Sequence, residues 1–272
     1  MDDRVAANRL NWDDRAKLHA TDTTGSYRIA DVLAGGDALH KIEADEIGDV
    51  AGRRLIHLQC HIGLDTISLA GRGAIATGLD FSAEAISAAR DMATPAKRDV
   101  RFVQSNIYDA PAALGTTYEI AYVTWGTICW LPDVFRWARV VSDVLEPGGF
   151  LYFCDTHPAA ACLEQIDGKL VPHYAWRTAP DAPIVMDVPT TYTGDARPLE
   201  HTRTYEWIHP LSDVLTALID AGLTIEWLHE HEYLPYRLFP MMVPAESKGL
   251  FRLPDGHSRI ALSFSLKATK RR

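Results

Sequence analysis

The chain has 272 residues, of which 47% are hydrophobic and 23% charged, values typical of a soluble globular protein with a sizeable core. Its formal net charge of −9 argues against a nucleic-acid surface, because clustered Lys and Arg supply most of the affinity for phosphates. No apolar run approaches the roughly 20 residues that span a bilayer, so we expect no membrane contact. The first residues lack the basic and apolar regions of a secretory signal, and the 4 cysteines show no paired spacing. We therefore expect a cytoplasmic protein.

Strand-like apolar runs alternate with helix-like stretches from Arg53 onward, which is typical of a parallel sheet with helices on both faces. Ser82 is a natural N-cap for one of the helices, and the turn Glu146–Gly149 separates another helix from the next strand. The predicted strands span residues 54–58, 74–79, 100–104, 118–124, 150–154, 223–230 and 260–266. The predicted helices span residues 64–71, 84–92, 132–145 and 211–221. The sequence therefore predicts an α/β fold.

The loop after the first predicted strand lies where α/β sheets bind nucleotides. It resembles motif I of the class I S-adenosylmethionine-dependent methyltransferases, in which an acidic residue and three glycines alternate with other residues. The glycine positions fall on Gln59, His61 and Gly63, with Cys60 between the first two, so only the last glycine is retained. The variant HLQCHxGxDT is usual in a bacterial small-molecule group of this family, which the chain resembles from about Asn11 to Leu266. The side chains of Gln59 and His61 must either point away from the cofactor or contact it.

Asp80, Phe81 and Ser82 follow the second predicted strand, at about the spacing of 20 positions at which such fingerprints carry an acidic residue. A carboxylate there accepts hydrogen bonds from both ribose hydroxyls, and the resemblance gives Asp80 that role. The alternative is that Asp80 only neighbours the helix N-cap.

Asn106 and Ile107 follow the third predicted strand, where the family often has an acidic residue for the adenine amino group and a backbone amide after it. The side-chain oxygen of Asn106 can still accept a hydrogen bond from an amine. The alternative is that Asn106 merely ends the strand, as Asn commonly does in turns.

Aromatic residues lie at two places that the resemblance puts near the cofactor. Trp125 and Gly126 follow the fourth predicted strand, where methyl donor and acceptor should meet, with Trp130 nearby. An aromatic ring there attracts a sulfonium, although Trp130 and Trp137 are equally plausible core residues. The N-terminal segment folds over the cofactor in similar enzymes, which makes its ring-bearing side chains candidate lid residues: Trp12, His19 and Tyr27.

The resemblance implies a Rossmann-like, seven-stranded, mostly parallel sheet with helices on both faces, an antiparallel last strand and an insert after the fifth strand. It implies S-adenosyl-L-methionine as the cofactor. We expect an N-terminal helical lid over residues 1–50, a cofactor-binding core over 51–155, a substrate-cap insert over 156–206 and the rest of the core over 207–272. The insert is rich in Pro, Thr, Asp and Tyr with weak periodicity, and we expect it to be partly stranded.

Histidine is the residue best suited to act as a base near neutral pH, where the acceptor atom carries a proton. His157 is the first candidate, because it follows the fifth predicted strand at the rim where substrates enter. His209 either faces the pocket as a second candidate or helps to start a helix, and the latter reading is favoured. The pair His229 and His231 lacks a third convergent ligand, and the Cys154, His157, Cys162 cluster lacks a fourth, so no metal is predicted at either.

The leading hypothesis is methyl transfer to an oxygen or nitrogen atom of a small molecule, with secondary metabolism as a candidate setting. The partner would be this small-molecule acceptor, with no nucleic acid and no membrane, and the protein would act as a monomer or homodimer. Two alternatives stay open. One is a non-catalytic S-adenosylmethionine-binding or regulatory protein of the same fold, which the altered glycines allow. The other is an NAD-dependent oxidoreductase, which the antiparallel final pair of strands disfavours.

Overall fold

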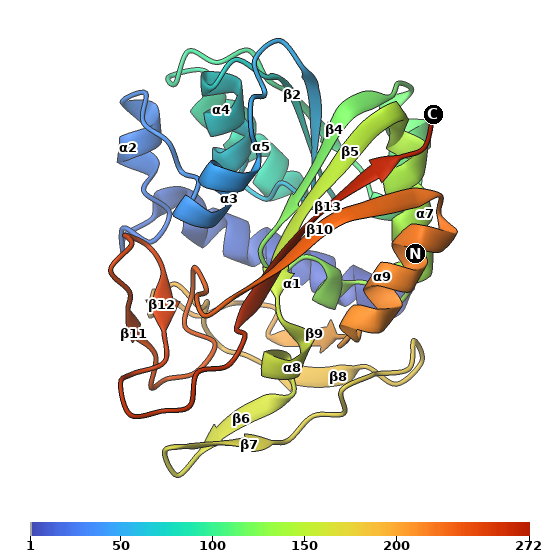
Figure 1. The fold of residues 1–272 in the computed structure, drawn as a ribbon. Helices are drawn as coiled ribbons and strands as arrows, with labels where there is room; N and C mark the ends of the chain where they lie inside the picture. Colours follow the sequence, from blue (N-terminus) through green and yellow to red (C-terminus); the bar gives the residue numbers. More distant parts are fainter. Residues whose placement is uncertain (1) are drawn as a thin grey trace.

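A sheet of seven strands forms the centre of the protein, whose computed structural model describes residues 2–272 (Figure 1). The strand order is β10-β13-β5-β4-β1-β2-β3, and β13 is the strand of this sheet that runs antiparallel to its neighbours. This confirms the predicted Rossmann-like sheet, mostly parallel and with an antiparallel last strand. The bounds are β1 (Arg54–Leu58), β2 (Ile75–Asp80), β3 (Arg101–Gln104), β4 (Tyr118–Thr124), β5 (Leu145–Thr156), β10 (Leu223–His231) and β13 (Ser263–Lys270).

Helices cover both faces of the sheet, because successive strand residues turn their side chains to opposite faces. Ile56 and Phe153 pack on one face with residues of α7 (Val134–Val144) and α9 (Leu211–Asp220). The fully buried Trp137 belongs to this face and is a core residue. Leu55 and Tyr122 pack on the other face with Leu69 of α4 (Leu64–Gly71). The remaining helices of the core are α5 (Ala83–Ala93) and α6 (Ala110–Leu114), with the 3₁₀ turns η1 (Ile107–Asp109) and η2 (Ile128–Trp130).

The strand β5 is longer than predicted. It begins at Leu145, so the predicted turn at Glu146–Gly149 is an irregularity within the strand. Leu145 pairs with Tyr118 of β4, and the next pair of the register joins Phe150 to Ile120. The proline and the two glycines of this segment therefore mark a β-bulge near the start of the pairing between β4 and β5.

The strand β13 lies nearer to the C-terminus than the predicted range of 260–266. Its last residues include Lys267 and Lys270, which break the apolar pattern that a buried strand presents. Lys270 Nζ instead donates to the carbonyl oxygens of Ser142 and Leu145, at 2.7 and 2.8 Å. These carbonyls end α7, where a cation is favoured by the helix dipole.

Short antiparallel hairpins fill the segment between β5 and α9, which agrees with the predicted partly stranded insert. In Figure 1 they lie beyond the carboxyl ends of the central strands. A third hairpin precedes β13. The elements are α8 (Pro158–Ala161), the hairpin of β6 (Leu163–Ile166) and β7 (Lys169–Pro172), the hairpin of β8 (Ile184–Asp187) and β9 (Arg203–Glu206), and the hairpin of β11 (Val243–Pro244) and β12 (Phe251–Arg252).

The N-terminal segment forms α1 (Asp3–Thr21), followed by α2 (Ile29–Leu33) and α3 (Lys41–Glu46). Figure 1 shows α1 lying across the carboxyl ends of the sheet, and it contacts both α5 and β9. Over residues 2–272, none of the helices is both long and apolar enough to cross a membrane.

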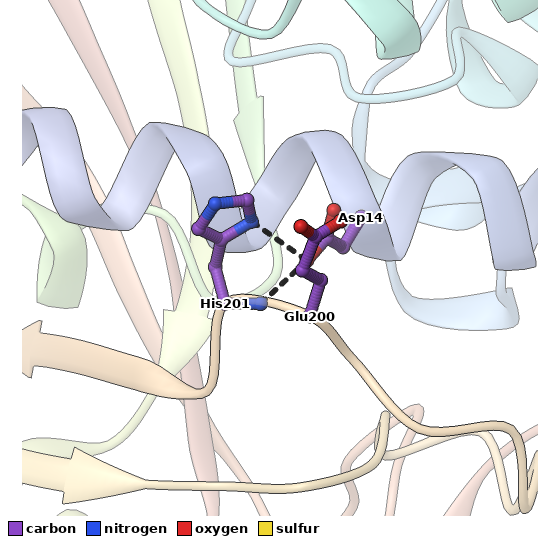
Figure 2. Close-up of side chains that lie close together, drawn as sticks. All are labelled: Asp14, Glu200 and His201. Carbon is purple, nitrogen blue, oxygen red and sulfur yellow. Dashed lines mark hydrogen bonds and ion pairs between the residues drawn. The ribbon is translucent and has the colours of Figure 1, made fainter.

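Polar side chains on one face of α1 hold the β8–β9 hairpin. Asn8 bonds the backbone of Tyr205 twice: its Nδ2 donates to the carbonyl oxygen at 2.7 Å, and its Oδ1 accepts from the amide at 2.8 Å. Asn11 Nδ2 donates to the carbonyl oxygen of His201 at 2.6 Å. Figure 2 shows His201 beside Asp14, whose Oδ2 lies 2.7 Å from the His201 amide nitrogen and 3.0 Å from Nδ1. The side chains of α1 thus form hydrogen bonds with backbone groups that a neighbouring strand would otherwise bind.

We expect Asn8→Ala to lower the free energy of unfolding by about 2 kcal/mol, because it leaves two backbone groups of Tyr205 without partners. Urea unfolding measures this loss, and hydrogen exchange should report faster opening of the β8–β9 hairpin. Arg9→Ala is the matched control on α1, because the pair of Arg9 with Asp13 is long, at 3.6 Å, and partly exposed. Equal losses in the two variants would contradict the role of Asn8.

Candidate active site

The loop after β1 has an unusual backbone. Gln59, His61 and Gly63 all have left-handed conformations, with φ angles of 59°, 50° and 76°. These are the three positions that carry glycine in motif I, and the first two adopt this conformation with side chains present, at a cost of about 1 to 2 kcal/mol each. Two hydrogen bonds hold the loop: Gln59 Nε2 donates to the carbonyl oxygen of Thr127 at 3.0 Å, and the His61 amide donates to Asp80 Oδ2 at 2.9 Å. The loop therefore adopts, at all three positions, the left-handed backbone that glycine favours, although two of the three residues carry side chains.

Gly63 is the position of this loop at which a side chain has no room. A Cβ atom there would lie 2.7 Å from the Phe102 ring and 2.8 Å from Cβ of Ala89. Gly63 precedes the first residue of α4, so its close packing brings the N-terminus of that helix against α5 and β3. The retained glycine is thus explained by packing as well as by its backbone angle.

Asp80 ends β2 and is buried, with 6% of its surface exposed. Its two carboxylate oxygens accept hydrogen bonds from the amides of His61 and Ser82, each at 2.9 Å. Burial raises the pKa of Asp80 to about 6. The Ser82 hydroxyl accepts from the amide of Ala85, as an N-cap of α5, and lies 2.6 Å from Asp13 Oδ1 on α1. The end of β2 is therefore joined both to the loop after β1 and to α1.

The neighbouring predicted residues have mainly structural contacts. Asn106 caps η1, because its Oδ1 accepts from the amide of Tyr108 at 2.9 Å, which agrees with the alternative reading of a strand end. An amide oxygen has a second lone pair, so this contact leaves room for an adenine amino group. Ile107 is buried. The Cys60 thiol is buried. The backbone oxygen of Phe81 accepts a long hydrogen bond from Gln104 Nε2, at 3.5 Å.

Aromatic and imidazole rings gather over the loop after β1, and we call this group the ring cluster. Trp12 lies with its ring centroid 5.1 Å from that of His61 and 5.3 Å from that of Trp130. His19 Nδ1 lies 2.8 Å from His61 Nε2 and 2.9 Å from the hydroxyl of Tyr27. The structure thus brings together the three predicted lid residues and His61. The members are Trp12, His19, Tyr27, His61, Trp130 and Tyr192.

The two histidines of the ring cluster are neutral at neutral pH. Burial lowers the pKa of His19 to about 2 and that of His61 to about 3. A neutral imidazole has one nitrogen that accepts a hydrogen bond and one that donates. The two rings therefore orient each other through a hydrogen bond between neutral imidazoles, and burial disfavours the protonation of either ring.

One member of the ring cluster, Tyr192, and two of its neighbours, Arg15 and Thr191, were not predicted from the sequence. Thr191 Oγ1 lies 2.5 Å from His19 Nε2, and the guanidinium of Arg15 faces the rings of Trp12 and Tyr192. The sequence could have indicated Arg15, because residues 12, 15 and 19 lie on one face of a helix. Thr191 and Tyr192 lie in the weakly periodic insert, where no pattern indicates which side chains point inward.

The loop after β4 is held by Asp155. Its carboxylate accepts from the amides of Gly126, Thr127 and Ile128, at 2.6, 3.0 and 3.3 Å. Trp125 has a left-handed backbone, with φ of 55°, and its indole Nε1 donates to Glu43 Oε1 of α3 at 3.1 Å. Trp125 therefore contacts the N-terminal segment rather than the ring cluster.

Glu43 should make the stability of the protein depend on pH. Burial raises its pKa to about 8, from an ordinary value of 4.5. The native state keeps this proton after the unfolded chain has released it, so stability falls as the pH rises from about 4.5 to about 8. Glu43→Gln should remove up to about 1.4 kcal/mol per pH unit from this slope.

The measurement is urea unfolding of wild type and Glu43→Gln at several pH values between 5 and 8, within the window set by the raised pKa. Glu84→Gln is the control, because that side chain is exposed. Burial also raises the pKa values of Asp65 and Asp80, each to about 6. These two groups act in the same direction, so Glu43→Gln should keep a smaller dependence of stability on pH below about pH 6. An unchanged slope in Glu43→Gln would assign the dependence to another group.

The two predicted bases lie outside the ring cluster. His157 caps α8 by accepting from the amide of Ala159, and its Nε2 lies 3.0 Å from Glu230 Oε1. It lines a cavity of about 270 Å³ together with Trp176 and Pro210. His209 is buried, with Nε2 at 2.7 Å from the carbonyl oxygen of Leu131. That bond ties the start of α9 to the segment after η2.

The chain is similar to known methyltransferases in sequence. The family described as "Methyltransferase domain" matches residues 56–151, from β1 to β5. The ubiquinone biosynthesis O-methyltransferase of Cronobacter sakazakii is 24% identical over 159 residues, which are 54% of this chain and 61% of that protein. The enzyme of the same name from Vibrio campbellii is 29% identical over 104 residues, 38% of this chain and 44% of that protein. The chain thus covers less than two thirds of the length of these curated relatives.

Solved structures share the fold over most of the chain. A putative S-adenosylmethionine-dependent methyltransferase from Listeria monocytogenes has a TM-score of 0.56 at 16% identity, covering 84% of this chain and 96% of the other. The glycopeptide N-methyltransferase MtfA, in complex with S-adenosylmethionine, has a TM-score of 0.52 at 15% identity, covering 88% and 94%. At such identities the likeness is one of fold.

Proposed function

We propose that the protein transfers the methyl group of S-adenosylmethionine to an oxygen or nitrogen atom of a small molecule, because residues 56–151 match the family described as "Methyltransferase domain". One observation carries this proposal: the loop after β1 keeps the left-handed backbone at Gln59, His61 and Gly63, with Asp80 hydrogen-bonded to it. Secondary metabolites are a candidate acceptor class. The named activities of the similar proteins include both O- and N-methylation.

The residues at the carboxyl ends of β1, β2 and β3 fit the cofactor. Asp80 would accept from the ribose hydroxyls, and Asn106 with Ile107 would hold the adenine. Gln59 Oε1 is buried and has no hydrogen-bond partner among residues 2–272, so it is an acceptor for the ammonium group of the cofactor. The other residues that we assign to this site are Trp12, Tyr27, Cys60, His61, Gly63, Phe81, Ser82, Trp125 and Gly126.

Bound S-adenosylmethionine supplies a methyl group already activated by its sulfonium, so the protein has to align the acceptor and exclude water. The ring cluster and α1 cover the loop after β1 and would perform that exclusion. His157 and His209 remain the candidate bases, because burial lowers the pKa values of His19 and His61 so far that both imidazoles are poor proton acceptors.

The two alternatives now carry less weight. A non-catalytic binding protein was suggested by the missing glycines, and the left-handed backbone at Gln59 and His61 removes much of that reason. An NAD-dependent oxidoreductase is disfavoured by the antiparallel β13 between β5 and β10 and by the methyltransferase-domain match.

Isothermal titration of the protein with S-adenosylmethionine and S-adenosylhomocysteine, with NAD as control ligand, tests the proposal. We expect affinities in the micromolar range, roughly −8 kcal/mol, for both adenosyl ligands. A screen of small phenols and amines for release of S-adenosylhomocysteine follows. Binding of NAD alone would exclude methyl transfer, and tight cofactor binding without turnover of any acceptor would favour the non-catalytic alternative.

A further inference from the structure

Arg15 is a buried cation without an anionic partner. It lies on α1 with 5% of its surface exposed, and no carboxylate among residues 2–272 lies within ion-pair distance of it. Its Nε donates to Asn11 Oδ1 at 2.6 Å, and its two terminal nitrogens have no hydrogen bond to the described residues. A guanidinium removed from water is costly unless an anion or several acceptors surround it. The environment of Arg15 is therefore incomplete.

Two aromatic rings hold the guanidinium in place. Its Cζ lies 5.4 Å from the ring centroid of Trp12 and 5.7 Å from that of Tyr192, which belongs to the insert. These cation–π contacts position the guanidinium but use none of its N–H donors. The terminal nitrogens are thus positioned as a fork, the geometry that binds a carboxylate through two parallel hydrogen bonds.

Arg15 lies between the ring cluster and the insert, because its guanidinium contacts Trp12 of α1 and Tyr192 of the insert. The charge of Arg15 lowers the pKa of the Cys129 thiol and of the Glu206 carboxyl, although burial raises both. Cys129 lies in η2, after β4, and Glu206 ends β9 of the insert. Asp80 and Asn106, which we assign to the adenosine, lie at the ends of β2 and β3, towards the other edge of the sheet.

Glu206 does not neutralise Arg15. Its single side-chain contact is with the Thr204 hydroxyl, at the long distance of 3.5 Å. Glu206 therefore leaves the positive charge of Arg15 without an ion pair, so a ligand that brings its own negative charge would be favoured beside Arg15.

We propose that Arg15 binds a carboxylate group of the methyl acceptor, an inference that rests on the proposed function. The acceptor class is then a small organic acid whose methylated atom lies near the loop after β4. Arg15 is in this case a specificity-determining residue, since a neutral analogue would leave its terminal nitrogens unpaired.

Benzoate and its neutral isostere benzamide are suitable probes, titrated into the full chain in the presence of saturating S-adenosylhomocysteine. We expect wild type to bind benzoate at least about tenfold more tightly than benzamide, and Arg15→Gln to lose this preference. Arg15→Lys, which keeps the charge without the fork, should retain a smaller preference and provides the test where the Gln variant does not fold. Arg9→Gln is the control, because Arg9 is a partly exposed arginine of the same helix. The absence of a preference in wild type, or its survival in Arg15→Gln, would overturn the proposal.

A second pair of ligands separates the acceptor from the cofactor, which also has a carboxylate. S-adenosylhomocysteine carries the amino-acid tail and 5′-methylthioadenosine lacks it. We expect Arg15→Gln to bind both as wild type does. Weaker binding of S-adenosylhomocysteine alone would assign Arg15 to the cofactor and refute the acceptor subsite, whereas failure of wild type to bind either ligand would refute the proposed function itself.

Discussion

Asp80→Ala is expected to weaken the binding of S-adenosylhomocysteine about 100-fold, the largest effect on affinity that we expect from a single substitution. A carboxylate that accepts from both ribose hydroxyls makes two charge-assisted hydrogen bonds, and the loss of about 2.7 kcal/mol corresponds to that factor. Isothermal titration measures the change. The substitution also removes the acceptor of the His61 and Ser82 amides, so the unfolding of the variant has to be measured alongside.

Asp80→Asn is the matched control, because it keeps one acceptor oxygen and the size of the side chain. We expect an intermediate loss of about tenfold. Since burial raises the pKa of Asp80 to about 6, the affinity of wild type should fall as the pH drops below that value, and Asp80→Asn should lack this fall. Equal affinities of wild type and Asp80→Ala would remove Asp80 from the cofactor site.

Gly63→Ala should cause the largest loss of stability, roughly 2 to 5 kcal/mol. Two costs add: about 1 to 2 kcal/mol for a left-handed residue with a Cβ atom, and about 1 to 3 kcal/mol for overpacking. The overpacking follows from the distances of 2.7 and 2.8 Å to Phe102 and Ala89. Denaturant unfolding measures the total.

Gly115→Ala separates the two costs. Gly115 also has a left-handed backbone, with φ of 64°, but a Cβ atom there has no neighbour within 4 Å. This control should lose only about 1 to 2 kcal/mol. Similar losses in the two variants would mean that backbone strain, rather than the contact with Phe102 and Ala89, makes glycine necessary at position 63.

The elements with strong local signals could be predicted from the sequence. The bounds of β1 and α4 agree with the structure residue for residue, and α5 begins after Ser82, whose hydroxyl caps it. The end of β13 could not be predicted, because the half-buried Lys270 bonds the end of α7. A strand residue of this kind cannot be recognised from the apolar periodicity of the sequence.

The part of the candidate site at the ends of the central strands could be predicted from the sequence, and the part formed by α1 and the insert could be predicted less well. Asp80 and the loop after β1 were found through strand ends and through the family resemblance. The ring cluster depends on contacts between α1 and the insert, which are far apart in the sequence, so its member from the insert, Tyr192, was not predicted. His157 follows β5 as predicted, but its imidazole contacts Glu230 and α8 rather than the ring cluster.

The position of α1 has a consequence for the order of ligand exchange. Asp13 contacts Ser82 beside the proposed adenosine pocket, whereas Asn8 and Asn11 bond the backbone of the insert. A displacement of α1 that uncovers one compartment therefore disturbs the other. In the proposed function the donor and acceptor sides would therefore open together, through the movement of one helix of 19 residues.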